Sequence, residues 1–258
     1  MRRALAAVLV LAGILGDVGA AAAERLVASL TNHHVMITSN YTGVELVLFG
    51  SVEPDAASLA HHGPYDIVAT ITGPRESLRT RRKQRVLGIW VNTQARIFVD
   101  PPSYLAVLAN RPLDAITSVD NLRRMRLGIA NTPLPELIHN DIGEVNTDPF
   151  RAALVRLMGE RGLYSEETNA VTFLTPTLFR AAISLPAQVP IGEYEVDVKL
   201  FAGGSLIAHT DSAFEIVKVG FEQFVVNAAR DHGVLYGLAL AMMALATGWI
   251  ASVAFRRD

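Results

Sequence analysis

The chain has 258 residues, of which half are hydrophobic and 19% are charged, so a disordered polyelectrolyte is excluded. Its net charge of -2 argues against a nucleic-acid-binding domain, and we expect no nucleic acid among its partners. The absence of cysteine excludes disulfides, thiolate catalysis and cysteine-ligated metals.

Residues 1–23 have the pattern of a secretory signal peptide. An arginine pair follows Met1, the run Ala4–Leu15 is apolar, and Ala20–Ala23 offer small residues for cleavage before Glu24. The alternative is an uncleaved anchor. The apolar run is short for a membrane span, and Asp17 interrupts it, so we favour the signal peptide.

Residues 24–112 form a predicted N-terminal β region, because short runs with alternating apolar residues are separated by turn residues. The predicted strands begin with 26–30 and 35–38, which form either one strand or two. They continue with 44–52, 66–72, 86–91, 96–99 and 104–109. We place a polar break at 92–94 and expect Trp90, with the apolar residues around it, in the core. Strands at this spacing favour an antiparallel sandwich over alternating βαβ units.

Residues 113–169 form a predicted helical and loop segment. Asp148 and Pro149 are typical of a helix start, and Gly162 is typical of a helix end. The apolar stripe expected on this helix is Phe150, Leu154, Leu157 and Met158. A shorter helix is predicted over 119–127, and 131–147 is predicted to be a loop.

Residues 170–220 return to strands and form a predicted immunoglobulin-like β region. In 193–200 the alternation is strict, with Tyr194, Val196, Val198 and Leu200 on the inward face. The run Pro190–Tyr194 is similar to the corner that enters the penultimate strand of immunoglobulin-like sandwiches. We therefore predict a mainly β protein: an immunoglobulin-like antiparallel β-sandwich with a short helical segment.

The C-terminal region indicates a single membrane span. A juxtamembrane helix is predicted over 221–232, followed by 233–255, which carry no charge. As a helix these residues are about 34 Å long, enough to cross the hydrocarbon core. Arg256 and Arg257 follow at once, which predicts that 256–258 form a cytoplasmic tail and that the body is exported.

Three sets of residues are candidates for contacts. Small residues on one face of the span could pack against another membrane helix, although alanine-rich composition alone gives the same pattern; they are Gly237, Ala241, Ala244, Gly248 and Ala251. A basic hairpin could bind anionic lipid or an acidic partner, or only protect a sheet edge; its residues are Arg75, Arg79, Arg81, Arg82, Lys83 and Arg85. His61 and His62 are candidates for a metal site; the alternative is that both are solvated histidines of a loop.

The order of elements resembles the alphaproteobacterial putative transmembrane protein family. The resemblance covers nearly the whole mature chain and rests on the terminal span and on Phe49-Gly50-Ser51, Tyr65–Val68 before Gly73-Pro74, Gly88–Asn92 and Tyr104–Val107. It implies an inner-membrane protein with a periplasmic body and no assigned activity. It also implies a sulfite-exporter-like permease as a partner, because genes of this family lie near such permeases.

The sequence contains no catalytic motif, and we expect no catalytic residues and no cofactor. We predict a single-pass inner-membrane protein, in contact with the lipid bilayer, that acts as an accessory or interaction subunit of a larger membrane complex. The alternative is a membrane-tethered periplasmic enzyme or a small-ligand or metal-binding module, with the loop 131–147 shaping a cleft.

Overall fold

The computed structural model describes residues 24–38, 40–53, 64–136, 149–220, 229–230 and 232–254. Several predictions therefore fall outside the described residues: the signal peptide 1–23, the tail 256–258, His61, His62, Asp148, most of the loop 131–147 and most of the helix 221–232.

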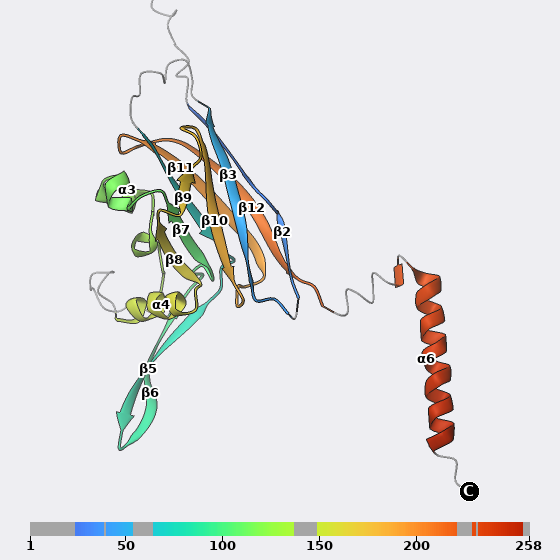
Figure 1. Ribbon diagram of the computed structural model, residues 1–258. Coiled ribbons are helices and arrows are strands. Elements are labelled where there is room, and N and C mark those ends of the chain that lie inside the picture. Colours follow the sequence, from blue (N-terminus) through green and yellow to red (C-terminus); the bar gives the residue numbers. More distant parts are fainter. Residues whose placement is uncertain are drawn as a thin grey trace, which may run out of the picture.

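The body is built around two β-sheets that lie face to face (Figure 1). The four-stranded sheet has the order β1-β3-β10-β9 and contains β1 (Arg25–Leu30), β3 (Gly43–Glu53), β9 (Val171–Phe173) and β10 (Leu178–Pro186). The six-stranded sheet has the order β2-β12-β11-β4-β7-β8. It contains β2 (His34–Ile37), β4 (Tyr65–Thr72), β7 (Leu105–Ala109), β8 (Tyr164–Thr168), β11 (Gly192–Ala202) and β12 (Ser205–Lys218). The predicted mainly β body is confirmed.

The core lies between these sheets, where alternate residues of each strand point inward. Strand β11 shows the predicted alternation, since Tyr194 and Leu200 are buried whereas Glu193 and Glu195 are exposed on the other face. The same core cluster takes in residues of the facing sheet, among them Leu46, Leu48 and Ile183.

The two predicted β regions share both sheets and form one sandwich. Strand β3 pairs with β1 on one side and β10 on the other, and β4 pairs with β7 and β11. These pairs are antiparallel, as predicted. The outer pairs of the six-stranded sheet, β2–β12 and β7–β8, are parallel.

The predicted corner before β11 is present. The Tyr194 hydroxyl donates a hydrogen bond of 2.6 Å to the carbonyl oxygen of Pro190, which holds the chain as it enters the strand. The Tyr194 ring lies edge-on to Tyr104, with ring centroids 5.7 Å apart, and stacks on Phe214 at 4.9 Å. This local geometry is that of a tyrosine corner in an immunoglobulin-like sandwich.

Short helices cover the outer face of the six-stranded sheet. They are α2 (Leu113–Ile116), α3 (Val119–Arg124) and the 3-10 turn η2 (Ile129–Asn131), followed by α4 (Pro149–Glu160). A second cluster packs Leu122 and Leu127 against Val68 and Phe201 of the sheet. Helix α3 ends earlier than predicted because Arg126 has a positive φ of 54°, which a helix cannot contain. On α4 the predicted stripe is buried except for Leu157, which is exposed.

Two strands leave the sandwich as a separate hairpin, β5 (Leu78–Val86) and β6 (Ile89–Phe98). In Figure 1 the hairpin projects beyond the end of the sheets. It follows β4, which is antiparallel to β11, and β11 is antiparallel to β12. Strands β4 and β12 therefore run in the same direction, so the hairpin and the chain that continues from Lys218 leave the six-stranded sheet at the same end.

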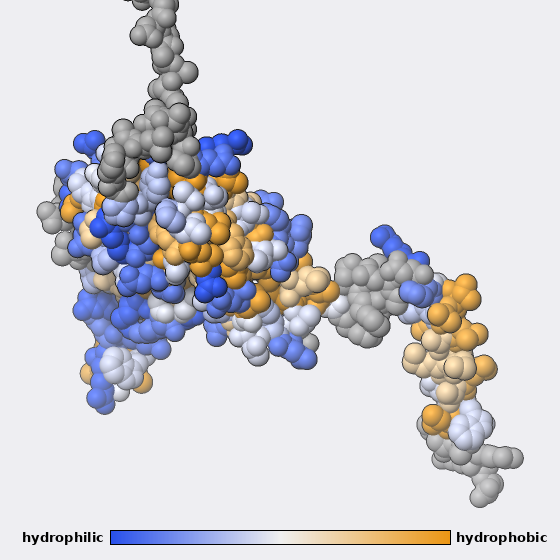
Figure 2. All heavy atoms as spheres, turned by 45° about the horizontal axis from the view of Figure 1, so that its top comes forward, coloured by the Kyte–Doolittle hydropathy of each residue, from blue (hydrophilic) through white to orange (hydrophobic). Residues whose placement is uncertain are grey.

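Helix α6 (Gly233–Ala254) is the one segment among the described residues long and apolar enough to cross a membrane. Its side chains are exposed along most of its length, and in Figure 2 its surface is largely hydrophobic. The hydroxyl of Thr247 donates to the carbonyl oxygen of Met243 at 2.7 Å, so this polar group is satisfied within the helix, as a lipid environment requires.

Candidate functional site

The predicted basic residues lie on or beside the β5–β6 hairpin. Arg75 precedes β5, and its backbone forms an isolated antiparallel β-bridge with Pro102. Its guanidinium donates to the carbonyl oxygen of Asp100 at 3.3 Å. The other five predicted basic residues, Arg79, Arg81, Arg82, Lys83 and Arg85, are on β5. Arg96 of β6 adds a sixth cation to the ribbon, and 78–98 contain no acidic residue.

These cations occupy both faces of the ribbon. Alternation along β5 places Arg79, Arg81, Lys83 and Arg85 on one face and Arg82 on the other. The β6 strand absorbs an extra residue at Thr93, whose hydroxyl donates to the carbonyl oxygen of Arg82 at 3.4 Å. The β5 cations therefore extend in two directions from a ribbon whose outer part no other described segment covers, whereas its base contacts α4.

The tip of the hairpin is apolar. Five large apolar side chains are exposed there, namely Val86, Leu87, Ile89, Trp90 and Val91. The exposed fraction is 98% for Leu87, 70% for Ile89 and 69% for Trp90. The expectation that Trp90 belongs to the core is wrong, because only the base of the hairpin, including Phe98, joins the core.

The turn of the hairpin is Leu87-Gly88, and both residues have positive φ, 50° and 89°. A two-residue turn of this kind matches the twist of the strands and favours asparagine or glycine at its first position. Leucine is disfavoured there because its side chain crowds the left-handed backbone. The predicted break at 92–94 is wrong: the strand continues through it because Thr93 is accommodated as a bulge.

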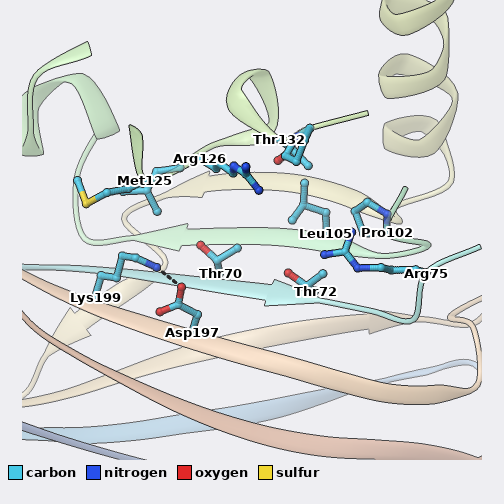
Figure 3. A pocket seen from close by; sticks show the side chains of 12 residues that line it. Thr70, Thr72, Arg75, Pro102, Leu105, Met125, Arg126, Thr132, Asp197 and Lys199 are labelled. Atoms are coloured by element: carbon cyan, nitrogen blue, oxygen red, sulfur yellow. Dashed lines mark hydrogen bonds and ion pairs between the residues drawn. The ribbon is translucent and has the colours of Figure 1, made fainter. Parts of the chain in front are cut away.

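A pocket of about 250 Å³ lies on the outer face of the six-stranded sheet (Figure 3). Its floor includes Thr70 and Thr72 of β4 with Asp197 and Lys199 of β11, and its rim includes Arg75 and Arg126. Lys199 and Asp197 form an ion pair. Three cations and one carboxylate therefore line the pocket, which suits a small anionic group.

Two polar atoms of this pocket are buried without a hydrogen-bond partner, the Thr70 hydroxyl and one carboxylate oxygen of Asp197. The wall opposite them is held by Arg151 of α4, which donates to the carbonyl oxygens of Ala130 at 3.2 Å and Thr132 at 2.7 Å. Burial lowers the pKa of Arg151. The pocket was not predicted, because its residues come from segments far apart in the sequence.

The predicted packing face of the span lies on α6. Gly237, Ala241, Ala244, Gly248 and Ala251 recur at helical spacing along one side. Large side chains, including Leu238, Leu245 and Ile250, are exposed on other sides. The chain therefore offers a narrow strip where a second helix could approach closely.

The predicted metal candidates His61 and His62 lie outside the described residues. Within the part of the chain that the structure describes, no group of three or more His, Asp or Glu residues is placed to hold a metal ion. His33 bonds the carbonyl oxygen of Ala213 at 2.9 Å through Nδ1, and His34 lies 3.9 Å from Glu215. These two histidines therefore make contacts between β2, with the residue before it, and β12.

Comparison with known proteins adds a family and a distant structural likeness. The family model described as "Putative transmembrane protein" (Alph_Pro_TM) matches residues 25–257. No curated protein matches the chain. The chain is similar to the crystal structure of AggA, the major subunit of aggregative adherence fimbriae type I from Escherichia coli, with 10% identity and a TM-score of 0.27, over 76% of this chain and 95% of that one.

Proposed function

This chain belongs to the alphaproteobacterial putative transmembrane protein family, and from that membership we propose that it is a single-pass inner-membrane protein with its β-sandwich body in the periplasm. The orientation is supported by the charges at the two ends. Arginines follow Met1, as in a signal peptide, and Arg256 and Arg257 follow the span, where positive charge favours the cytoplasmic side.

Within that topology we propose an accessory or interaction subunit of a larger membrane complex. The observation that carries this function is the β5–β6 hairpin, which exposes apolar and cationic side chains together at the end of the body where the chain leaves for the span. Exposed apolar side chains do not stabilise the fold of an isolated chain, and such a surface is typical of a site that contacts another protein or a membrane.

The span supplies the second contact. Its small-residue face permits close approach of another membrane helix, and a sulfite-exporter-like permease is the partner that we propose. In this proposal α6 contacts the partner protein inside the bilayer, and the hairpin of the body makes its contact at the membrane surface.

Site-specific crosslinking in cells tests the accessory function. A photoreactive residue at Ala244 is expected to crosslink to a polytopic membrane protein, whereas the matched position Leu245 is expected to give lipid adducts. Gly248→Leu should reduce the Ala244 crosslink about tenfold, because it separates the helices, and Ile250→Leu should leave it unchanged. Equal crosslinks from both positions, or none, would contradict the accessory function.

The pocket over the six-stranded sheet favours a second candidate function, a tethered module that binds a small anion. Its three cations and the unpartnered hydroxyl of Thr70, which is able to donate a hydrogen bond to an anion, support this alternative. The two functions differ in their dependence on the span. Ligand binding by the pocket would survive Gly248→Leu, whereas docking through the small-residue face would not.

A further inference from the structure

We propose that the β5–β6 hairpin inserts its tip into the surface of an anionic lipid bilayer. The apolar residues at Leu87–Trp90 enter the boundary between headgroups and acyl chains, and the cations of β5 lie against the lipid phosphates. This inference rests on the proposed function in one respect, namely that the body stands beside the membrane that α6 crosses.

The first support is the order of side chains along the hairpin. A bilayer presents anionic headgroups first and hydrocarbon below them. The hairpin has apolar Leu87 and Ile89 at its tip, Trp90 next to them, and the cations Arg81 and Lys83 nearer its base. With the tip inserted, the apolar residues reach the hydrocarbon while the cations stay at the level of the headgroups. Tryptophan beside a cationic stem is typical of side chains that sit at the membrane interface.

The second support is the positive charge of β5, which the described residues do not compensate. None of Arg79, Arg81, Arg82 and Lys83 forms an ion pair with any of the described residues. Arg96, by contrast, lies 3.9 Å from Glu136, closer to the base of the ribbon. Uncompensated cations repel one another in water, and an anionic surface relieves that repulsion.

The third support is the backbone of Leu87. Its φ of 50° is unfavourable for leucine, and its side chain has no contact that would offset this within the fold, because 98% of it is exposed. Asparagine would make a more stable turn at this position. The unfavourable backbone of this exposed leucine is therefore offset when its side chain is buried in an apolar environment outside the molecule.

The fourth support is position. In the six-stranded sheet Thr72 of β4, Glu195 of β11 and Ala213 of β12 form one row, and beyond it β4 leads to the hairpin and β12 toward the span. The strands of the hairpin extend about 30 Å, at about 3.3 Å per residue. Residues 219–232 can span at most about 50 Å, so the tip can reach the bilayer before this connection is fully extended.

A bilayer explains the distribution of charge better than an acidic protein does. A protein surface covers one face of a two-stranded ribbon, whereas Arg82 extends from the opposite face to Arg81 and Lys83. An inserted tip is surrounded by headgroups on every side. An acidic protein would also leave the apolar tip in water unless it supplied a separate groove.

Tryptophan fluorescence of the full chain in proteoliposomes tests the inference. The chain has two tryptophans, Trp90 and Trp249, so Trp249→Phe leaves Trp90 as the single reporter. In vesicles of phosphatidylcholine mixed with phosphatidylglycerol we expect a blue-shifted emission that brominated acyl chains quench. In phosphatidylcholine alone the quenching should be much weaker.

Matched charge variants separate insertion from general attraction. Arg79→Gln, Arg81→Gln and Lys83→Gln together should lower the ratio of inserted to free hairpin about fivefold for each cation removed. The control removes three exposed arginines elsewhere on the body, Arg123, Arg124 and Arg161, and should preserve the quenching. Leu87→Ser with Ile89→Ser should also abolish quenching while the melting temperature of the body is unchanged.

The inference is overturned by Trp90 emission that stays water-like in anionic vesicles, or by equal quenching in the hairpin variant and its control. The first result would favour an acidic protein as the hairpin's partner. Failure here is distinguishable from failure of the accessory function, because the vesicles contain no other protein and the crosslink from Ala244 is measured separately.

Discussion

At the scale of single residues, Tyr194 joins local sequence to tertiary structure. Its hydroxyl is tied to the carbonyl of Pro190, and its ring packs between Tyr104 and Phe214. Burial raises the pKa of the Tyr194 phenol, so the group stays a neutral donor throughout the physiological range. The hydroxyl of Tyr104 donates in turn to the carbonyl of Ser184 at 2.8 Å, in the opposite sheet.

We expect Tyr194→Phe to destabilise the body by about 1 kcal/mol, because the ring stays packed while the Pro190 carbonyl loses its donor. The melting temperature measured by circular dichroism should fall by about 2–4 °C. Tyr236→Phe, which changes a hydroxyl on α6, should leave the unfolding of the body unaltered. An unchanged melting temperature for Tyr194→Phe would show that the corner bond does not stabilise the sandwich.

Residues differ in how far the sequence predicts them. Tyr194 was predictable because its partner is four positions away and the proline-glycine-tyrosine pattern is local. Trp90 was not, because burial depends on whether another layer covers a strand, and apolar composition looks the same in both cases. The available signal was that the apolar run directly follows a basic run and contains Gly88, a residue that tolerates the positive φ of a tight turn.

At the scale of elements, strand periodicity predicted most of the sandwich, whereas the hairpin was predicted with the wrong turn. The polar run 92–94 resembles a break, yet β6 passes through it by a one-residue bulge at Thr93. A bulge leaves no composition signal, because the extra residue is defined by the register of the partner strand. The starts of α3 and α4 were predicted correctly because helix starts are marked by local residues; Ser118, for example, accepts a hydrogen bond from the Asn121 amide, whereas α2 and η2 were not predicted.

We expect Leu87→Asn to stabilise the hairpin and weaken its attachment to lipid. Asparagine tolerates the left-handed backbone, so amide exchange in β5 and β6 should slow about fivefold. Quenching of Trp90 by brominated lipid should fall at the same time. Leu174→Asn, which changes an exposed leucine outside the hairpin, is the matched control and should alter neither quantity. Unchanged or faster exchange in the Leu87 variant would contradict the strain that we assign to the turn.

At the scale of the whole molecule, orientation across the membrane is directly testable because the chain contains no cysteine. A cysteine introduced at Ser205, an exposed residue after the Gly203-Gly204 turn, should react with an impermeant maleimide in intact spheroplasts. A cysteine introduced at Asp258 should react only after permeabilisation. The cysteine-free chain sets the background, and labelling of both positions only after permeabilisation would contradict a periplasmic body.

The mainly β class of the body followed from the spacing of short strands, but the way its two β regions combine did not. Residues of β3 pair with β10, more than a hundred positions later, and β4 pairs with β11. Such pairings are set by tertiary packing and leave no local trace in the residues concerned. The pocket follows the same logic, since Thr70, Arg126 and Lys199 meet only once β4, β11 and the segment after α3 are in place.

This interleaving also governs when the chain is able to fold during synthesis. As the ribosome releases the polypeptide from its N-terminus, β3 and β4 emerge long before β10, β11 and β12, the strands that cover and flank them. Their apolar inward faces remain exposed until nearly all of the body has been translated, because β10, β11 and β12 are the last strands before α6. The nascent chain is therefore exposed to aggregation for most of its elongation, and chaperones that hold unfolded polypeptides are most important to it in that interval.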